Sequence, residues 1–486
     1  MLDSDHLRPA DSADSRPPLG ILETATLWHV GALVIFSAWA LGGNAGWSRT
    51  VVDVLACLGV LITAAGLRRR PSENGKNRFP RPFRWLWPLF LFDVLVIASL
   101  FNPNFREVTF DASTYFTRGE PPYAFLPSAA RPDRALEALL FFNGVYLSCF
   151  NLVLFVRHRF ALRRLLMILA INALLLAIFG TLQKLHGASG LFFNAAASPQ
   201  IYFFSSFIYH NHWSSFTLLM VGISLGLIFH YARRPTGRDV WHSPVGLGIV
   251  AVLLLAASIP LSASRSCTIL ALVFLTGAFL HWLWQLLRRR REHRQGSLFL
   301  PALGGSIAFV IALAGIYELA RPVIEARMSL TAEQVSVLKE AGNFGAREIL
   351  YRDTWRMASD RPWFGWGFAS YSTVFNYYNS QLWASPDGLP TYYDDAHSDW
   401  LQSFAEVGFV GTALLGLCGL VPLFRRWHVA TRSPLSLYLL SGCAIILAYA
   451  WLEFPFGNTA VVIAFWTCFF SAIQYGRADS PSSRHG

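Results

Sequence analysis

Apolar runs of membrane-spanning length are the feature that most constrains how this chain folds. A helix that crosses a bilayer needs about 20 predominantly apolar residues. The chain is 54% hydrophobic and only 14% charged, whereas soluble domains carry about 25% charged residues. The apolar runs begin near Leu27, Thr50, Trp85, Glu137, Leu165, His212, Pro244, Cys267, Leu298, Ser403, Pro434 and Thr459. We therefore expect an all-α, polytopic membrane protein with about 12 transmembrane helices.

The basic residues between these runs set the expected orientation. Alternate connections hold 22 arginines and lysines in one set and 7 in the other. Because cytoplasmic loops are enriched in Arg and Lys, the richer set and both termini are expected in the cytoplasm. The net charge of +11 then reflects topology and contact with membrane lipids, and no nucleic-acid partner is expected.

Two connections on the outer side are too long to be simple links between helices. They span 102–134 and 320–400, and the second is rich in Trp, Tyr and Phe, so it should be ordered. The expected organisation is a disordered cytoplasmic tail at 1–25, transmembrane helices 1–9 at 26–319, a long, partly helical catalytic loop at 320–400, transmembrane helices 10–12 at 401–475 and a cytoplasmic tail at 476–486.

The 320–400 loop contains the densest mixture of arginine, carboxylate, histidine and aromatic residues. Its pattern predicts a helix over 346–359, which ends before a proline. At 100° per residue, Arg347 lies on one face of that helix, while Arg352 and Arg356 share another. Arg347 can therefore point into a cleft while the other two arginines meet headgroups or solvent.

His397 lies just before the apolar run that starts the next predicted span. If a helix begins there, Asp399, Gln402 and Glu406 share one of its faces. The carboxylates near His397 could also suggest a divalent metal, but their spacing matches no strong ligand motif, so neither a metal nor another cofactor is expected. Gly408 and Gly411 in the same helix should allow a neighbouring helix to approach closely.

Arg265 is a further candidate, because it lies in a very short turn between two apolar runs on the outer side. An arginine near a bilayer boundary usually has a partner. It could simply reach phospholipid phosphate, or it could bind the phosphate of a lipid substrate.

Several motifs together resemble the O-antigen ligase and polymerase family of bacterial inner-membrane enzymes. They are R-x-x-x-Y-R-D from Arg347, P-x-x-G-x-G from Pro362, A-H-S-D-x-L-Q-x-x-x-E-x-G-x-x-G from Ala396, S-x-S-R-S around Arg265 and Y-H-N-H-W from Tyr209. The resemblance covers roughly residues 203–470, with Tyr351 at a position where the family more often has tryptophan.

The resemblance implies a GT-C-type glycosyltransferase of lipopolysaccharide or exopolysaccharide assembly. Such an enzyme takes a glycan from undecaprenyl diphosphate and passes it to an acceptor hydroxyl on the periplasmic side. A ligase uses lipid A–core as acceptor, and a polymerase uses another glycan. By position, Arg265 and Arg347 would hold the diphosphate and His397 would act on the acceptor. The further substrate-binding candidates are His210, Asn211, His212, Arg352, Arg356, Asp399 and Glu406.

The chemistry of these residue types supports such a reaction. A guanidinium fork matches phosphate oxygens and stabilises a departing diphosphate. A neutral histidine can take the proton of a sugar hydroxyl as the new bond forms. No clear nucleophile for a covalent intermediate is visible, which favours inversion in a single displacement. A polysaccharide or lipid transporter is the alternative class, but transporters tend to place ionisable groups at mid-membrane in two related halves.

Overall fold

The computed structural model describes residues 18–68, 81–111, 113–232, 244–293, 299–341, 346–382 and 389–478. In this part of the chain, ten helices are long and apolar enough to cross a membrane, and two shorter apolar helices, α14 (Pro434–Tyr449) and α15 (Thr459–Tyr475), follow them. The all-α polytopic prediction is therefore confirmed. The ends of both predicted tails, at 1–17 and 479–486, and parts of the basic connections lie outside the described residues.

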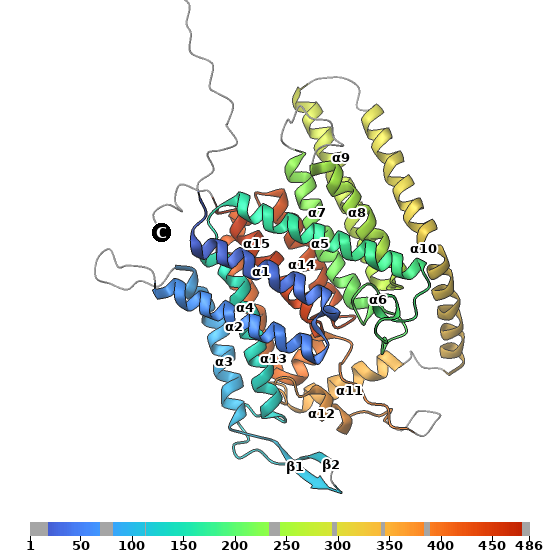
Figure 1. The fold of residues 1–486 in the computed structure, drawn as a ribbon. Coiled ribbons are helices and arrows are strands. Elements are labelled where there is room, and N and C mark those ends of the chain that lie inside the picture. The colour runs from blue at the N-terminus through green and yellow to red at the C-terminus, as the bar shows by residue number, and fades with distance from the viewer. Residues whose placement is uncertain are drawn as a thin grey trace, which may run out of the picture.

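The long helices follow one another as in Figure 1. Their bounds are α1 Ile21–Trp39, α2 Gly46–Arg68, α3 Trp87–Leu100 (of spanning length only together with the 3-10 turn before it), α4 Pro132–Phe155, α5 Arg159–Leu185, α7 His210–Tyr231, α8 Pro244–Leu261, α9 Arg265–His293, α10 Phe299–Ala341 and α13 Asp399–Ala430. The shorter helices are α6 Leu191–Asn194, α11 Ala346–Asp360 and α12 Tyr371–Val374, and the 3-10 turns are η1 Leu41–Gly43, η2 Arg81–Leu86, η4 Phe375–Tyr377 and η5 Pro455–Gly457. Helix α11 confirms the helix predicted over 346–359.

Helix α7 forms the centre of the bundle, because it is buried along nearly its whole length and packs against α5, α8, α14 and α15. Glycines let the backbone of α14 come close: a Cβ on Gly222 would lie 3.0 Å from the Tyr438 carbonyl oxygen. Helix α10 is the opposite case. It packs against α8 and α9 at the edge of the bundle (Figure 1), and no residue of its most apolar window is fully buried.

The 102–134 connection contains a β-hairpin that the sequence analysis did not anticipate. Strands β1 (Phe105–Phe110) and β2 (Ser113–Arg118) pair antiparallel, with Phe105 opposite Arg118. Aromatic and β-branched residues occur in both strands and favour this pairing, with Val108 opposite Tyr115 and Thr109 opposite Thr114. The Phe105 ring packs edge-on against Trp366 at 6.3 Å. Figure 1 shows the hairpin together with α11 and α12 at one end of the bundle, which we call the site end.

The glycine-rich turn at 362–367 docks into an interruption of α13 at Gly408. Gly408 has a φ of +65°, and a Cβ there would lie 2.4 Å from the Trp363 carbonyl carbon. Backbone N–H groups of Trp366 and Gly367 donate to Ala405 and Glu406, while those of Phe409 and Val410 donate back to Pro362 and Trp363. Gly408 was expected to admit a neighbouring helix. That expectation is wrong, because a turn occupies the space.

Candidate functional site

His397 lies at the site end, directly before α13, and its backbone and ring are both held. Its φ is +51°, a left-handed conformation that is uncommon for a residue with a side chain. The Tyr351 hydroxyl donates to the His397 carbonyl oxygen at 2.9 Å. The imidazole Nδ1 lies 3.3 Å from Oε2 of Glu453. An ionised carboxylate only accepts hydrogen bonds, so this contact assigns the proton to Nδ1 and leaves Nε2 as the acceptor in the neutral ring.

Glu453, which was not among the predicted site residues, joins two of them. It lies in the connection between α14 and α15, its side chain is 3% exposed, and its carboxylate accepts hydrogen bonds from both His397 and Nη2 of Arg347. Burial alone would raise the pKa of this carboxyl, but the hydrogen bond from His397 and the charge of Arg347 outweigh it and hold the pKa below the ordinary value. The carboxylate therefore stays ionised.

Arg347 reaches the Glu453 carboxylate from α11, on a face of the helix different from that of Arg352 and Arg356, as the sequence predicts. Burial lowers the pKa of Arg347, but the charge of Glu453, its hydrogen bond and the nearby tyrosines Tyr351 and Tyr209 together outweigh burial and hold the pKa above the ordinary value. Arg352 and Arg356 are exposed on the other side of α11. The Arg356 guanidinium is 3.9 Å from Asp353 at its nearest, so neither residue converges with Arg347 on Glu453.

An aromatic side chain, Phe454, connects the His397 loop to the start of α7. The His397 ring meets Phe454 edge-on at 4.7 Å, and the His212 ring does so at 5.0 Å. Tyr209 stacks on Phe454 at 5.5 Å. His210 packs against Tyr209 on another side, at 4.7 Å. The structure thus brings His212 and His397 onto one ring, and it places both α7 histidines against Tyr209.

Asn211 extends the same network to the start of α9. Its amide Nδ2 donates to the Tyr209 hydroxyl at 2.9 Å, and its Oδ1 accepts from Ser264 Oγ at 2.6 Å. The next residue, Arg265, is the first of α9 and is exposed. A continuous set of contacts therefore runs from His397 through Phe454, Tyr209 and Asn211 to Ser264, beside Arg265.

Asp399 and Glu406 bind backbone groups of the protein itself. The Asp399 carboxylate accepts from the Phe456 N–H at 2.9 Å. Glu406 accepts from the N–H groups of Ala369 and Tyr371, at 2.9 and 3.1 Å, and from Gln402 at 3.3 Å. These contacts fix the loops around the site.

Two further features bear on what the site can hold. Within the described ranges, no group of three or more His, Cys, Asp or Glu side chains is arranged to bind a metal ion.

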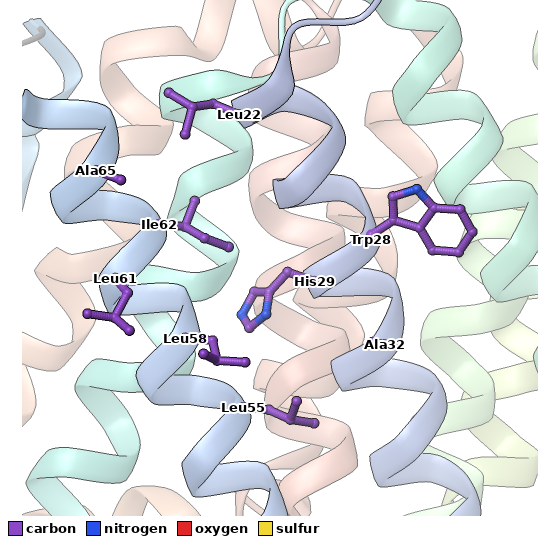
Figure 2. A pocket seen from close by; sticks show the side chains of 9 residues that line it. All are labelled: Leu22, Trp28, His29, Ala32, Leu55, Leu58, Leu61, Ile62 and Ala65. Carbon is purple, nitrogen blue, oxygen red and sulfur yellow. The ribbon is translucent and has the colours of Figure 1, made fainter. Parts of the chain in front are cut away.

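An apolar groove between α1 and α2, shown in Figure 2, is lined by Leu55, Leu58, Ile62 and their neighbours, with the His29 ring turned into it. None of the predicted site residues lines this groove, so it is separate from the His397 network.

The fold and the site define a polytopic membrane protein with guanidinium and imidazole groups gathered at one end of its bundle. Residues 250–416 match the family model described as O-antigen ligase, and the chain carries the domain of that family. The match includes Arg265, Arg347 and His397 and ends before Glu453. It supports activity of the O-antigen ligase or polymerase type, with lipid-linked glycans as the substrate class and membrane lipids as partners. No curated protein gives a significant match to the chain.

Proposed function

We propose that this protein transfers a glycan from undecaprenyl diphosphate to a hydroxyl of lipid A–core. In this proposal it resides in the bacterial inner membrane, with both termini cytoplasmic and the 320–400 loop at the periplasmic face. The observation that carries the proposal is the Glu453 carboxylate, which binds the imidazole of His397 and the guanidinium of Arg347 at once. One buried group thus places a proton acceptor beside an anion-binding cation.

The donor diphosphate is assigned to Arg347 and Arg265. A guanidinium has five N–H donors in a planar fork, and the ion pair to Glu453 uses the Nη2 end of Arg347. Arg265 begins α9, where the N–H groups of a helix start also attract negative charge. Both groups stabilise the charge that develops on the diphosphate as its bond to the sugar breaks.

The acceptor hydroxyl is assigned to His397. The oxygen of the acceptor hydroxyl bonds to the anomeric carbon of the donor sugar, while the diphosphate leaves with the bonding electron pair. The hydroxyl proton passes to Nε2 of His397. Glu453 acts as a positioning residue, because it holds the ring through Nδ1 and stabilises the imidazolium that forms. A single displacement of this kind inverts the anomeric carbon and proceeds without a metal ion.

The α7 residues His210, Asn211 and His212 are assigned to glycan or acceptor contact, since they lie around Tyr209 beside the proposed base. Asp399 and Glu406 shape the pocket through the loops they fix. Arg352 and Arg356 would meet substrate from the exposed side of α11.

The test is purified protein incubated with an undecaprenyl-diphosphate-linked glycan and either lipid A–core or a second donor molecule, followed by product mass. Transfer to lipid A–core supports ligation, whereas a lengthened lipid-linked glycan identifies a polymerase instead. His397→Ala, Arg347→Ala and Arg265→Ala should each abolish product while the variant stays at wild-type level in the membrane. Normal product from any of them removes that residue from the site. Loss of activity with a chelator would disprove metal independence.

A further inference from the structure

A second pair of arginines converges at the site end, on the indole of Trp366. The Arg118 Cζ lies 4.8 Å from the ring centroid and the Arg361 Cζ lies 4.3 Å from it. Arg118 ends β2, and Arg361 directly follows α11. The two cations therefore come from the two long outer connections and meet on one aromatic side chain.

Trp366 holds these cations in fixed positions. Its indole is fully buried and donates from Nε1 to the Met357 carbonyl oxygen at 2.8 Å. Its backbone N–H donates to Ala405 at 3.0 Å, and its carbonyl oxygen accepts from Ala130 at 2.8 Å. Trp366 thus joins the 102–134 connection, the 362–367 turn and α13 through its hydrogen bonds.

Among the residues that the structure describes, no carboxylate forms an ion pair with either guanidinium, although the charge of Asp360, whose carboxylate accepts from the Tyr378 hydroxyl, acts on Arg361. Within those residues, neither guanidinium has a carboxylate oxygen within 4.0 Å, whereas Arg131, nearby over the Phe116 ring, is paired with Asp133 at 2.6 Å. Burial, reinforced by the like charge of Arg118, lowers the pKa of the Arg361 guanidinium. Arg361 donates to the Ser128 hydroxyl, a neutral partner. An anion is the partner that this arrangement lacks.

The surroundings of the pair indicate where that anion comes from. Trp363, in the turn after Arg361, is exposed, as are Phe101 at the end of α3 and Phe409 in α13 beside the docked turn. Exposed aromatic side chains at the ends of spanning helices are typical of the headgroup level of a bilayer. The guanidinium pair therefore lies at the depth of lipid phosphates.

We propose that Arg118 and Arg361 form a binding site for the phosphate of an anionic phospholipid headgroup, separate from the site around His397. Guanidinium forks suit phosphate oxygens, and basic pockets at membrane boundaries bind anionic headgroups. A headgroup seated there links the hairpin to the turn that docks into α13. The inference rests on the Trp366 contacts, the lack of a paired carboxylate and the exposed aromatic side chains nearby, and it is independent of the glycan-transfer proposal.

The test is native mass spectrometry of the purified full-length protein titrated with phosphatidylglycerol or, in parallel, with phosphatidylcholine. The Arg118→Gln/Arg361→Gln variant should bind the first phosphatidylglycerol about tenfold more weakly than wild type. Arg106→Gln/Arg134→Gln is the matched control, because it removes two exposed charges from the same connection without touching Trp366. It should bind as wild type does, and phosphatidylcholine should not distinguish the three proteins.

Two further arms separate the site from its alternatives. Arg118→Lys/Arg361→Lys keeps both charges but loses the planar fork, and an intermediate affinity is expected. If the glutamine pair fails to fold, the single Arg118→Gln variant, at an exposed position, replaces it. Equal lipid binding in the arginine pair and its control overturns the site. Displacement of the lipid by inorganic phosphate or glucuronate at equal concentration shows a site for soluble anions and overturns the lipid assignment.

Discussion

Two buried glutamates at the site end show how differently one side chain is used within the same fold. Glu406 and Glu453 are 6% and 2% exposed, so burial does not separate them. Glu406 accepts hydrogen bonds from two backbone N–H groups and a glutamine amide. These three partner groups are uncharged and do not titrate near neutral pH. Glu453 accepts from an imidazole and a guanidinium. The partners, rather than the burial, mark Glu453 as part of the chemistry and Glu406 as part of the frame.

The largest effect is expected for Glu453→Gln. The amide keeps the shape of the side chain but no longer stabilises the imidazolium of His397, so glycan transfer should fall about 100-fold or more. Single-turnover rates, normalised to folded protein, measure this effect. A rate close to that of wild type would reduce Glu453 to a purely structural role.

Gly408→Ala should lower the stability of the fold without removing a group that takes part in the proposed glycan transfer. The left-handed backbone and the close approach of the Trp363 carbonyl carbon both oppose a side chain, at a cost of about 1–3 kcal/mol or more of unfolding free energy. Gly416→Ala in the same helix is the matched control, since a Cβ there meets nothing within 4 Å. Denaturation of the two purified variants measures the difference. Equal stability would show that the turn does not lock α13.

Glu406→Gln should lower stability by about 1–2 kcal/mol, because an amide oxygen replaces two carboxylate oxygens as acceptor for the Ala369 and Tyr371 N–H groups. The transfer rate per folded molecule should stay within about threefold of wild type, in contrast to Glu453→Gln. Rates normalised to folded protein distinguish the outcomes. A loss as large as that of the Glu453 variant would move Glu406 from the frame into the site.

The smallest effect is expected in the dependence of stability on pH. The folded pKa of Glu453 is below the ordinary value of 4.5. The stability that this carboxylate contributes is therefore complete above about pH 4.5 and is lost as the pH falls through the lower folded value. The melting temperatures of wild type and Glu453→Gln should converge in this acid range. A gap that stays constant down to about pH 3 would contradict the ion-pair account.

Much of the frame was predictable because it depends on local patterns. Apolar runs identify spans, and the 346–359 pattern with its terminal proline identifies α11. The hairpin left a signal in the β-branched and aromatic residues of 105–118, among them Val108 and Tyr115, but the mostly helical context hid it. The docking of the 362–367 turn into α13 was not predictable, because Gly408 alone does not say which segment approaches it.

The site was predictable only where its residues share a motif. Arg347 and His397 stand out in the 320–400 loop, and the structure joins them through Glu453. Glu453 lies 56 positions from His397, in a short connection between two apolar runs. Its available signal was a lone carboxylate in an apolar stretch, which usually has a partner in a membrane protein. The Arg118–Arg361 pair left no such signal, since tertiary packing on Trp366 creates it.

The interruption of α13 divides that helix into two mechanical parts. Residues 399–407 are hydrogen-bonded to the 362–367 turn and to Phe456, while the longer remainder runs among the spanning helices. The same turn is also bonded to Phe409 and Val410, just beyond the glycine. A displacement of the spanning part of α13 would therefore be passed to the 362–367 turn, and so to the loop that holds His397.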